Sequence, residues 1–136
     1  MRRFFSDVSQ LDSSTPSFFQ VELLEGEAGG ELRVGQVFRY RFKLFGLPFP
    51  WVTHIDRVDP DCFVDSQARG PYRTFHHTHA FYEVSGGTLM LDRIDYTLWF
   101  GPLNPLVNSL AVAPMLRAIF RFRSASARDR FGETPL

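Results

Sequence analysis

The sequence FHHTHAF at positions 75–81, followed by TLMLDRIDYTL at 88–98, decides the fold. In both stretches two kinds of side chain alternate along the chain. Residues two apart in a strand share one face of a sheet. Ser85, Gly86 and Gly87 stand between the stretches and are typical of a tight turn. The two stretches therefore predict a β-hairpin in which His79 lies directly or diagonally opposite Asp92.

One face of this hairpin mixes large aromatic side chains with a few ionisable groups. Its members are Phe75, His77, His79 and Phe81 on the first strand and Thr88, Met90, Asp92, Ile94, Tyr96 and Leu98 on the second. Such a mixture is more typical of the wall of a ligand cavity than of a plain hydrophobic core. We therefore expect this face to line a cavity.

Length and composition indicate a single domain spanning residues 1–136. Fifteen basic and fifteen acidic residues give no formal net charge, so a nucleic-acid partner is not expected. The single Cys62 excludes an intrachain disulfide and a Cys-based zinc site, and it fits a reducing, cytoplasmic location. Arg2 and Arg3 are not followed by an apolar segment, so we do not expect a signal peptide.

Six alternating segments separated by short turns predict an antiparallel meander. They cover residues 18–24, 34–45, 49–58, 62–68, 72–84 and 87–100. Residues 1–11 are weakly helical in character, and Ser13 to Pro16 are typical of a turn or a helix cap.

The hydrophobic period then changes to three or four residues, which predicts a helix beginning at Asn104-Pro105. Its first half is apolar nearly all round and is expected to be buried on more than one side. We expect Pro114 to kink the helix and the chain after Ser124 to fray. Residues 96–115 carry no charge, but their prolines and Gly101 argue against stable membrane insertion. The fold class is therefore α+β, with one helix covering a curved sheet.

These residues resemble the SRPBCC group of START-like, Bet v1-like and polyketide cyclase/dehydrase-like ligand-binding proteins. The resemblance covers roughly residues 18–123. The stretches Leu47-Pro48-x-Pro50-Trp51-x-x-x-Ile55 and Phe120-Arg121-Phe122-Arg123 fit it, and it rests mainly on three motifs. They are Phe63-x-Asp65-x-Gln67-x-x-Gly70-Pro71-Tyr72, Phe75-x-His77-x-His79-x-Phe81 and Gly87-Thr88-x-Met90-x-Asp92-Arg93-x-x-Tyr96. Phe75 stands where the family usually has tryptophan. The resemblance implies a helix-grip fold in which Trp51, Thr53 and Ile55, and also Phe63, Asp65 and Gln67, join the cavity face.

The family's first strand, which normally pairs with the last one, has no counterpart in this sequence. Without it the strand at 87–100 would be an exposed edge, which proteins usually avoid. A true translation start upstream of Met1, pairing of two chains at this edge, or a short strand at residues 1–5 would each resolve this. We favour self-association, that is, a homodimer through the last strand.

The expected ligand-binding residues are Trp51, Gln67, Phe75, His77, His79, Phe81, Met90, Asp92 and Tyr96. His79 and Asp92 form the best pair, either as a buried network that fixes the sheet register or as ligand contacts or proton-transfer groups. His77, His79 and a carboxylate are a workable set of metal ligands. Because H-x-H on a strand is not diagnostic, no metal is predicted. Gln67 and Asp65 either line the cavity mouth or bond the neighbouring loop, and Tyr96 either meets a ligand or bonds within the wall.

Three functions remain open at this point. The first, which we favour, is binding of a hydrophobic or amphipathic small molecule such as a lipid, isoprenoid or polyketide, without a cofactor. The second is a cyclase or dehydratase that moves protons with His79 and Asp92. The third is a regulatory or interaction module whose uncharged segment 98–115 contacts a membrane or partner. Fold alone does not decide among them.

Overall fold

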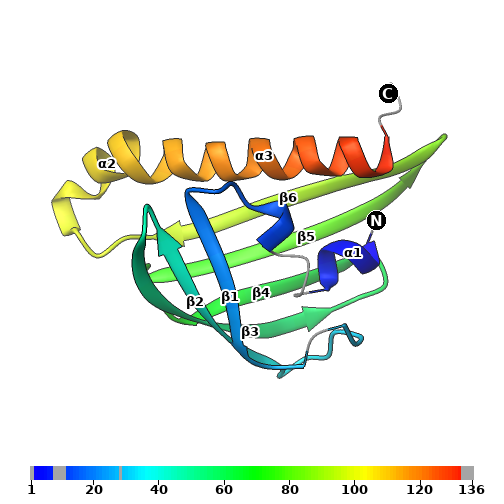
Figure 1. Ribbon diagram of the computed structural model, residues 1–136, viewed down its shortest axis with the longest axis horizontal. Helices are drawn as coiled ribbons and strands as arrows, with labels where there is room; N and C mark the ends of the chain where they lie inside the picture. The colour runs from blue at the N-terminus through cyan, green and yellow to red at the C-terminus, as the bar shows by residue number, and fades with distance from the viewer. Residues whose placement is uncertain (1, 8–11, 28, 133–136) are drawn as a thin grey trace.

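A computed structural model of the chain describes residues 2–7, 12–27 and 29–132. Six strands form one antiparallel sheet in sequence order, which confirms the predicted meander (Figure 1). The strands are β1 Phe19–Glu25, β2 Val37–Leu44, β3 Leu47–Val58, β4 Cys62–Arg69, β5 Thr74–Val84 and β6 Gly87–Thr97. His79 lies directly opposite Asp92 in the β5–β6 pairing, as predicted.

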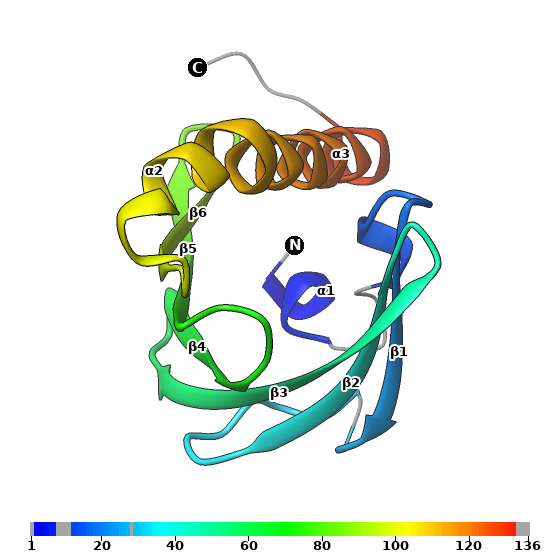
Figure 2. The same ribbon diagram turned by 90° about the vertical axis from the view of Figure 1, so that its left-hand side faces the viewer.

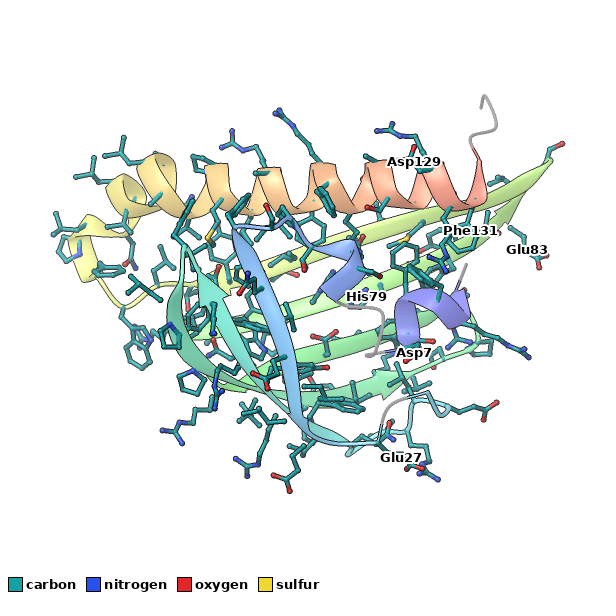
Figure 3. All side chains as sticks on the ribbon, in the orientation of Figure 1. Asp7, Glu27, His79, Glu83, Asp129 and Phe131 are labelled. Atoms are coloured by element: carbon teal, nitrogen blue, oxygen red, sulfur yellow. The ribbon has the colours of Figure 1, made fainter. Side chains whose placement is uncertain are left out.

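The C-terminal part of the chain is helical without interruption from residue 101 to residue 131. It comprises η3 Gly101–Leu103, α2 Asn104–Val107, the π-helical turn η4 Asn108–Val112 and α3 Ala113–Phe131. The sheet curls around this helix in the manner of a grip (Figures 1 and 2). The fold is thus a Bet v1-like helix-grip. Charged side chains such as Glu27, Glu83 and Asp129 lie on the outside of the molecule, whereas His79 lies between sheet and helix (Figure 3).

The kink expected at Pro114 stays a prediction. A π-helical turn, η4, ends just before this proline, which has no amide hydrogen for a carbonyl of the preceding turn. Two other expectations about the helix need correction. The helix does not fray at Ser124 but continues to Phe131 and ends at Gly132, whose φ of 77° breaks the helical geometry.

The first half of the helix is not buried on more than one side. Leu106 is 56% exposed and Leu110 is 73% exposed, because only one side of the helix faces the sheet. By length and composition alone, the segment Gly101–Phe131 is long and apolar enough to cross a membrane.

Figure 2 shows α1 of the N-terminal segment in the space between sheet and helix, and Figure 1 shows that it lies toward one end of the molecule. It contains α1 Arg2–Ser6 and the short 3-10 helix η2 Asp12–Ser14. Residues 2–5 are therefore helical, so the proposal that residues 1–5 form a strand beside β6 is wrong. In the described part of the chain, β6 is one edge of the sheet. The helical character expected for residues 8–11 lies outside the described residues.

Candidate functional site

A cavity of about 650 Å³ lies between the concave face of the sheet and the helix. Its lining is mostly aromatic and aliphatic, and it reaches from α1 at one end to Leu47 and Phe100 at the other. This volume is in the range that drug-sized ligands and cofactors occupy. The alternation of β2 to β5 produces the cavity, because every second side chain points to the concave face.

One half of the cavity wall is aromatic. The Trp51 ring lies 5.1 Å from the Phe42 ring and 5.0 Å from the Phe75 ring, and the Tyr72 and Phe75 rings are 4.9 Å apart. The indole N–H of Trp51 donates to Thr53 Oγ1 at 3.0 Å. The only polar atom of the Trp51 side chain is therefore satisfied within the wall, and its ring offers apolar surface.

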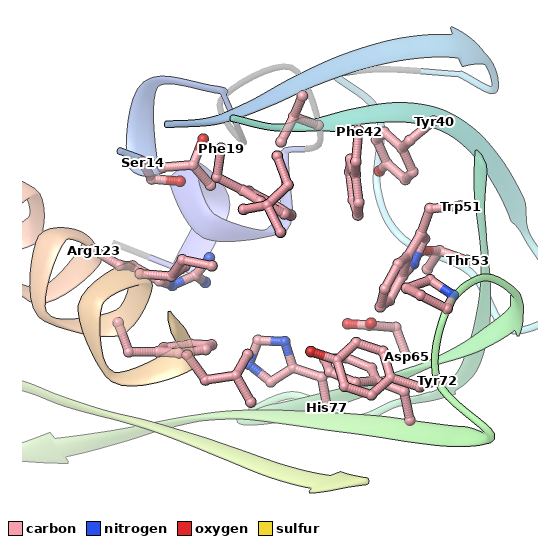
Figure 4. A pocket seen from close by; sticks show the side chains of 18 of the residues that line it. Ser14, Phe19, Tyr40, Phe42, Trp51, Thr53, Asp65, Tyr72, His77 and Arg123 are labelled. Atoms are coloured by element: carbon pink, nitrogen blue, oxygen red, sulfur yellow. The ribbon is translucent and has the colours of Figure 1, made fainter. Parts of the chain in front are cut away.

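The other half of the wall holds a polar cluster of five side chains, which we call the inner cluster. Its members are Asp65 from β4, His77 and His79 from β5, Asp92 from β6 and Arg123 from α3. Figure 4 shows Arg123 reaching from the helix toward the side of the cavity where His77 and Asp65 lie. All except Asp92 line the cavity.

Strand register brings the carboxylates to the histidines. Asp65 is opposite His77 in the β4–β5 pairing, and Asp92 is opposite His79 in the β5–β6 pairing. The observed bonds run diagonally as well as directly across. His79 Nε2 lies 2.8 Å from Asp65 Oδ2, and His77 Nε2 lies 2.9 Å from Asp92 Oδ1. His79 Nδ1 lies 3.2 Å from Asp92 Oδ1.

Arg123 closes the inner cluster from the helix. It lies one turn after Ile119, so both side chains face the sheet and both are buried. Its Nε is 3.4 Å from Asp92 Oδ2, and its Nη2 is 3.4 Å from His79 Nδ1. Its guanidinium carbon also lies 4.6 Å from the centre of the Phe5 ring, within the range of a cation–π contact.

The pKa values of the two buried histidines shift in opposite directions. Burial, together with the charge of His79, lowers the pKa of His77 to about 4, although its hydrogen bond to Asp92 opposes this. Burial also acts to lower the pKa of His79, but its hydrogen bonds to Asp65 and Asp92 outweigh burial and raise it. Near neutral pH, His77 is therefore neutral, whereas the two hydrogen bonds of His79 favour its imidazolium form.

Both carboxylates of the inner cluster are ionised. Burial alone would raise the pKa of Asp65, but the hydrogen bond and charge of His79 lower it below its ordinary value. The pKa of Asp92 is lowered in the same way, by hydrogen bonds from His77 and His79 that exceed the effect of burial. A carboxylate held this firmly in the ionised form is a weak proton acceptor.

Three residues of the inner cluster have the donor atoms of a metal site. One ligand atom each from Asp65, His77 and His79 lies within 4.8 Å of the other two. The guanidinium of Arg123 already lies 3.4 Å from His79 Nδ1, and its positive charge disfavours a second cation there. The cluster thus supplies its own cation, so we assign no metal to it.

The structure brings together only part of the predicted ligand-binding set. Trp51, Phe75, His77 and His79 line the cavity, together with Asp65. Gln67 instead bonds the loop, with its Nε2 donating to the Tyr72 carbonyl at 2.8 Å and its Oε1 accepting from the Tyr72 amide at 3.0 Å.

The remaining predicted residues do not line the cavity. Phe81 is buried against Phe63. The Tyr96 hydroxyl donates to the Asn108 side chain and is satisfied within the wall. Met90 and Asp92 line a separate groove between the edge of β6 and the C-terminal half of α3. The last strand has no neighbour on that side within the described residues, so its side chains reach this groove.

Sequence reasoning missed Arg123 as a member of the site. The sequence feature that indicates its place in the site is the helical spacing of Leu116, Ile119 and Arg123. This spacing puts a charged residue in the stripe that faces the sheet. Arg117, Arg121 and Arg128 lie on the same helix outside this stripe, and all three are exposed.

No protein-family model matches this chain, and no curated protein matches its sequence. Several solved structures share its fold. A protein from Chromobacterium violaceum has 12% identity and a TM-score of 0.68, covering 98% of this chain and 87% of that one. A protein from Thermus thermophilus has 13% identity and a TM-score of 0.67, covering 95% of this chain and 88% of that one.

A plant protein is also similar. Major latex-like protein 151 from Panax ginseng has 19% identity and a TM-score of 0.60, covering 90% of this chain and 84% of that one. At these identities the likeness establishes the fold alone, which is Bet v1-like. It specifies no ligand.

Proposed function

We propose that this protein binds a hydrophobic or amphipathic small molecule in the cavity between the sheet and α3, as a member of the SRPBCC group. The observation that carries the proposal is the cavity of about 650 Å³, whose wall is apolar except for a few buried polar groups. Apolar surface supplies affinity by burial, and a few fixed polar groups orient a ligand.

A cavity-filling substitution tests this proposal. Leu116 lines the cavity, whereas Leu110 is 73% exposed and does not line it. Leu116→Trp should weaken binding of an apolar dye such as Nile red by about tenfold or more, because the indole takes the space of the dye. Leu110→Trp is the matched control and should bind the dye as the wild type does. Equal binding by both variants, with both folded, would reject the cavity as the site.

The structure does not favour the enzymatic alternative as first formulated. A cyclase or dehydratase using His79 and Asp92 needs both groups at the cavity. Asp92 lies on the outer groove and contacts three donors, His77, His79 and Arg123. Its lowered pKa also makes it a poor base.

A second candidate function is contact with an anionic membrane, and the side chains at the cavity mouth favour it. Leu47 and Phe100 line this end of the cavity, and the apolar side chains near them in the sequence, Phe45, Trp99 and Leu103, are also exposed. The segments 35–55 and 96–128 contain no Asp or Glu but several Arg and Lys residues. Apolar side chains among basic residues suit an anionic lipid surface.

Vesicle sedimentation tests this second candidate. The wild type should co-sediment with vesicles of mixed phosphatidylcholine and phosphatidylglycerol and less with phosphatidylcholine alone. Leu47→Glu should weaken the association, whereas Leu91→Glu, exposed on the opposite face of the sheet, should not. Equal sedimentation of the two variants, or none of the wild type, would reject membrane contact at the mouth.

A further inference from the structure

Arg123 is a buried cation whose hydrogen-bonding capacity the protein uses only in part. Arg123 is 7% exposed, and its Nε has no hydrogen-bond acceptor among the described residues. Its polar contacts, to Asp92 Oδ2 and His79 Nδ1, are both 3.4 Å long. A guanidinium has five N–H donors, and leaving buried donors unsatisfied is costly.

His79 cannot serve as the missing acceptor. Its two ring nitrogens face carboxylate oxygens of Asp65 and Asp92 at 2.8 and 3.2 Å. An imidazole donates to carboxylates on both sides only when both nitrogens carry hydrogen, that is, as an imidazolium. Arg123 Nη2 therefore faces a donor rather than an acceptor at Nδ1. Arg123 lines both the cavity and the groove beside β6, and Figure 4 shows it from the side of the cavity.

The charges of the inner cluster fix the kind of acceptor that fits. Asp65 and Asp92 are negative, Arg123 and the His79 imidazolium are positive, and His77 is neutral, so the cluster sums to zero. A bound carboxylate or amine would add an unbalanced charge to a buried site, which is costly. An uncharged oxygen acceptor would satisfy Arg123 and leave the balance intact.

We propose that Arg123 donates hydrogen bonds to the carbonyl oxygen of an uncharged amphipathic ligand, such as a long-chain ketone or ester, rather than to a fatty-acid carboxylate. This inference rests on the proposed function and specifies its ligand class. The Phe5 ring against the guanidinium carbon, at 4.6 Å, holds the plane of the donors. The apolar body of the ligand then lies along the aromatic half of the wall, toward Leu47 and Phe100 at the mouth.

Competition against Nile red tests the inference on the wild-type protein. The competitors are a long-chain methyl ketone and the carboxylate, primary amine and alkane of the same chain length, at neutral pH. We expect the ketone to compete about tenfold more strongly than each of the other three. A carboxylate or amine that competes best, or equal competition by all four, would overturn the inference and leave cavity binding standing. If neither Nile red nor any competitor binds, the proposed function itself fails.

A pair of variants assigns the preference to Arg123. Arg123→Met should reduce the advantage of the ketone over the alkane to near one while the alkane still competes. Arg121→Met, on the solvent side of α3, should keep the full advantage. Circular dichroism checks that both variants are folded, and if Arg123→Met is not, Arg123→Lys takes its place and should retain part of the advantage. An unchanged ketone preference in a folded Arg123 variant would overturn the role of this residue.

Discussion

His76 and His77 are neighbours in β5, yet they belong to two clusters of histidine and aspartate on opposite faces of one sheet. On the convex face, His54 Nδ1 lies 2.6 Å from Asp56 Oδ1 and His76 Nδ1 lies 3.9 Å from Asp56 Oδ2. The side chains of His54 and His76 are 41% and 56% exposed, whereas those of His77 and His79 are 11% and 6% exposed.

The same residue types therefore have different energetic consequences on the two faces. Water screens the convex cluster, so its pairs contribute little to stability. In the inner cluster each charge depends on protein partners, because water is largely excluded. Pairs of residues of the same type, one buried beside the cavity and one exposed, can test this difference directly.

The largest effect is expected from Arg123→Met, because it removes the only guanidinium of the inner cluster and leaves Asp92 without that partner. We expect a loss of about 3–5 kcal/mol in the free energy of unfolding, typical of a broken buried ion pair. Arg121→Met, its twin on the exposed side of α3, should change the value by no more than about 0.5 kcal/mol. Urea denaturation monitored by circular dichroism measures both, and similar losses would contradict the contrast between the two sides.

The next effect concerns pH. The pKa of His77 is about 4 in the folded protein and 6.5 in the unfolded chain, so the unfolded chain takes up the proton first as the pH falls. The stabilisation by neutral His77 is fully present above pH 6.5. It is lost as the pH falls toward 4, and the loss is on the order of 3 kcal/mol.

Urea denaturation across this pH range measures that loss. His77→Gln should flatten the decrease, since glutamine takes up no proton. His76→Gln, which removes a side chain that is 56% exposed, should alter the profile much less. The raised pKa of His79 acts in the opposite direction, since its stabilisation is present below pH 6.5 and is lost only as the pH rises through its folded pKa. A decrease that persists unchanged in His77→Gln would contradict the assignment.

The smallest effect should come from a single hydroxyl. Tyr96 donates to Asn108 and so ties β6 to the π turn of the helix. Tyr96→Phe should cost about 1 kcal/mol, the usual net contribution of one hydrogen bond. Tyr82→Phe, on the convex side of β5 and 47% exposed, should cost less than about 0.5 kcal/mol. Thermal denaturation of the two variants side by side makes the comparison, and the reverse order would contradict it.

Local alternation was enough to predict the sheet and the His79–Asp92 pairing. The turn at Ser85 to Gly87 sets the hairpin register, and the period of two then assigns every side chain of β5 and β6 to a face. The same alternation correctly separated His77 and His79 from His76.

Contacts between distant segments were not predictable in this way. Alternation puts Gln67 and Tyr96 on the concave face, but it cannot show that a loop or Asn108 will satisfy them. Asp92 belongs to the predicted face, yet it lies at a sheet edge and reaches the outer groove. The helical spacing puts Arg123 on the stripe that faces the sheet, but its partners Asp92 and His79 follow only from the packing of α3 on the sheet.

The central claim, that the cavity holds the ligand, is tested most directly by the two tryptophans. Trp51 lines the cavity and is 7% exposed, whereas Trp99 is 65% exposed and does not line it. The measurement is quenching of tryptophan fluorescence by a long-chain methyl ester with a brominated chain, in Trp99→Phe and in Trp51→Phe. We expect saturable quenching in Trp99→Phe, which retains Trp51, and little in Trp51→Phe. Quenching confined to Trp99, or absent from both variants, would contradict the account.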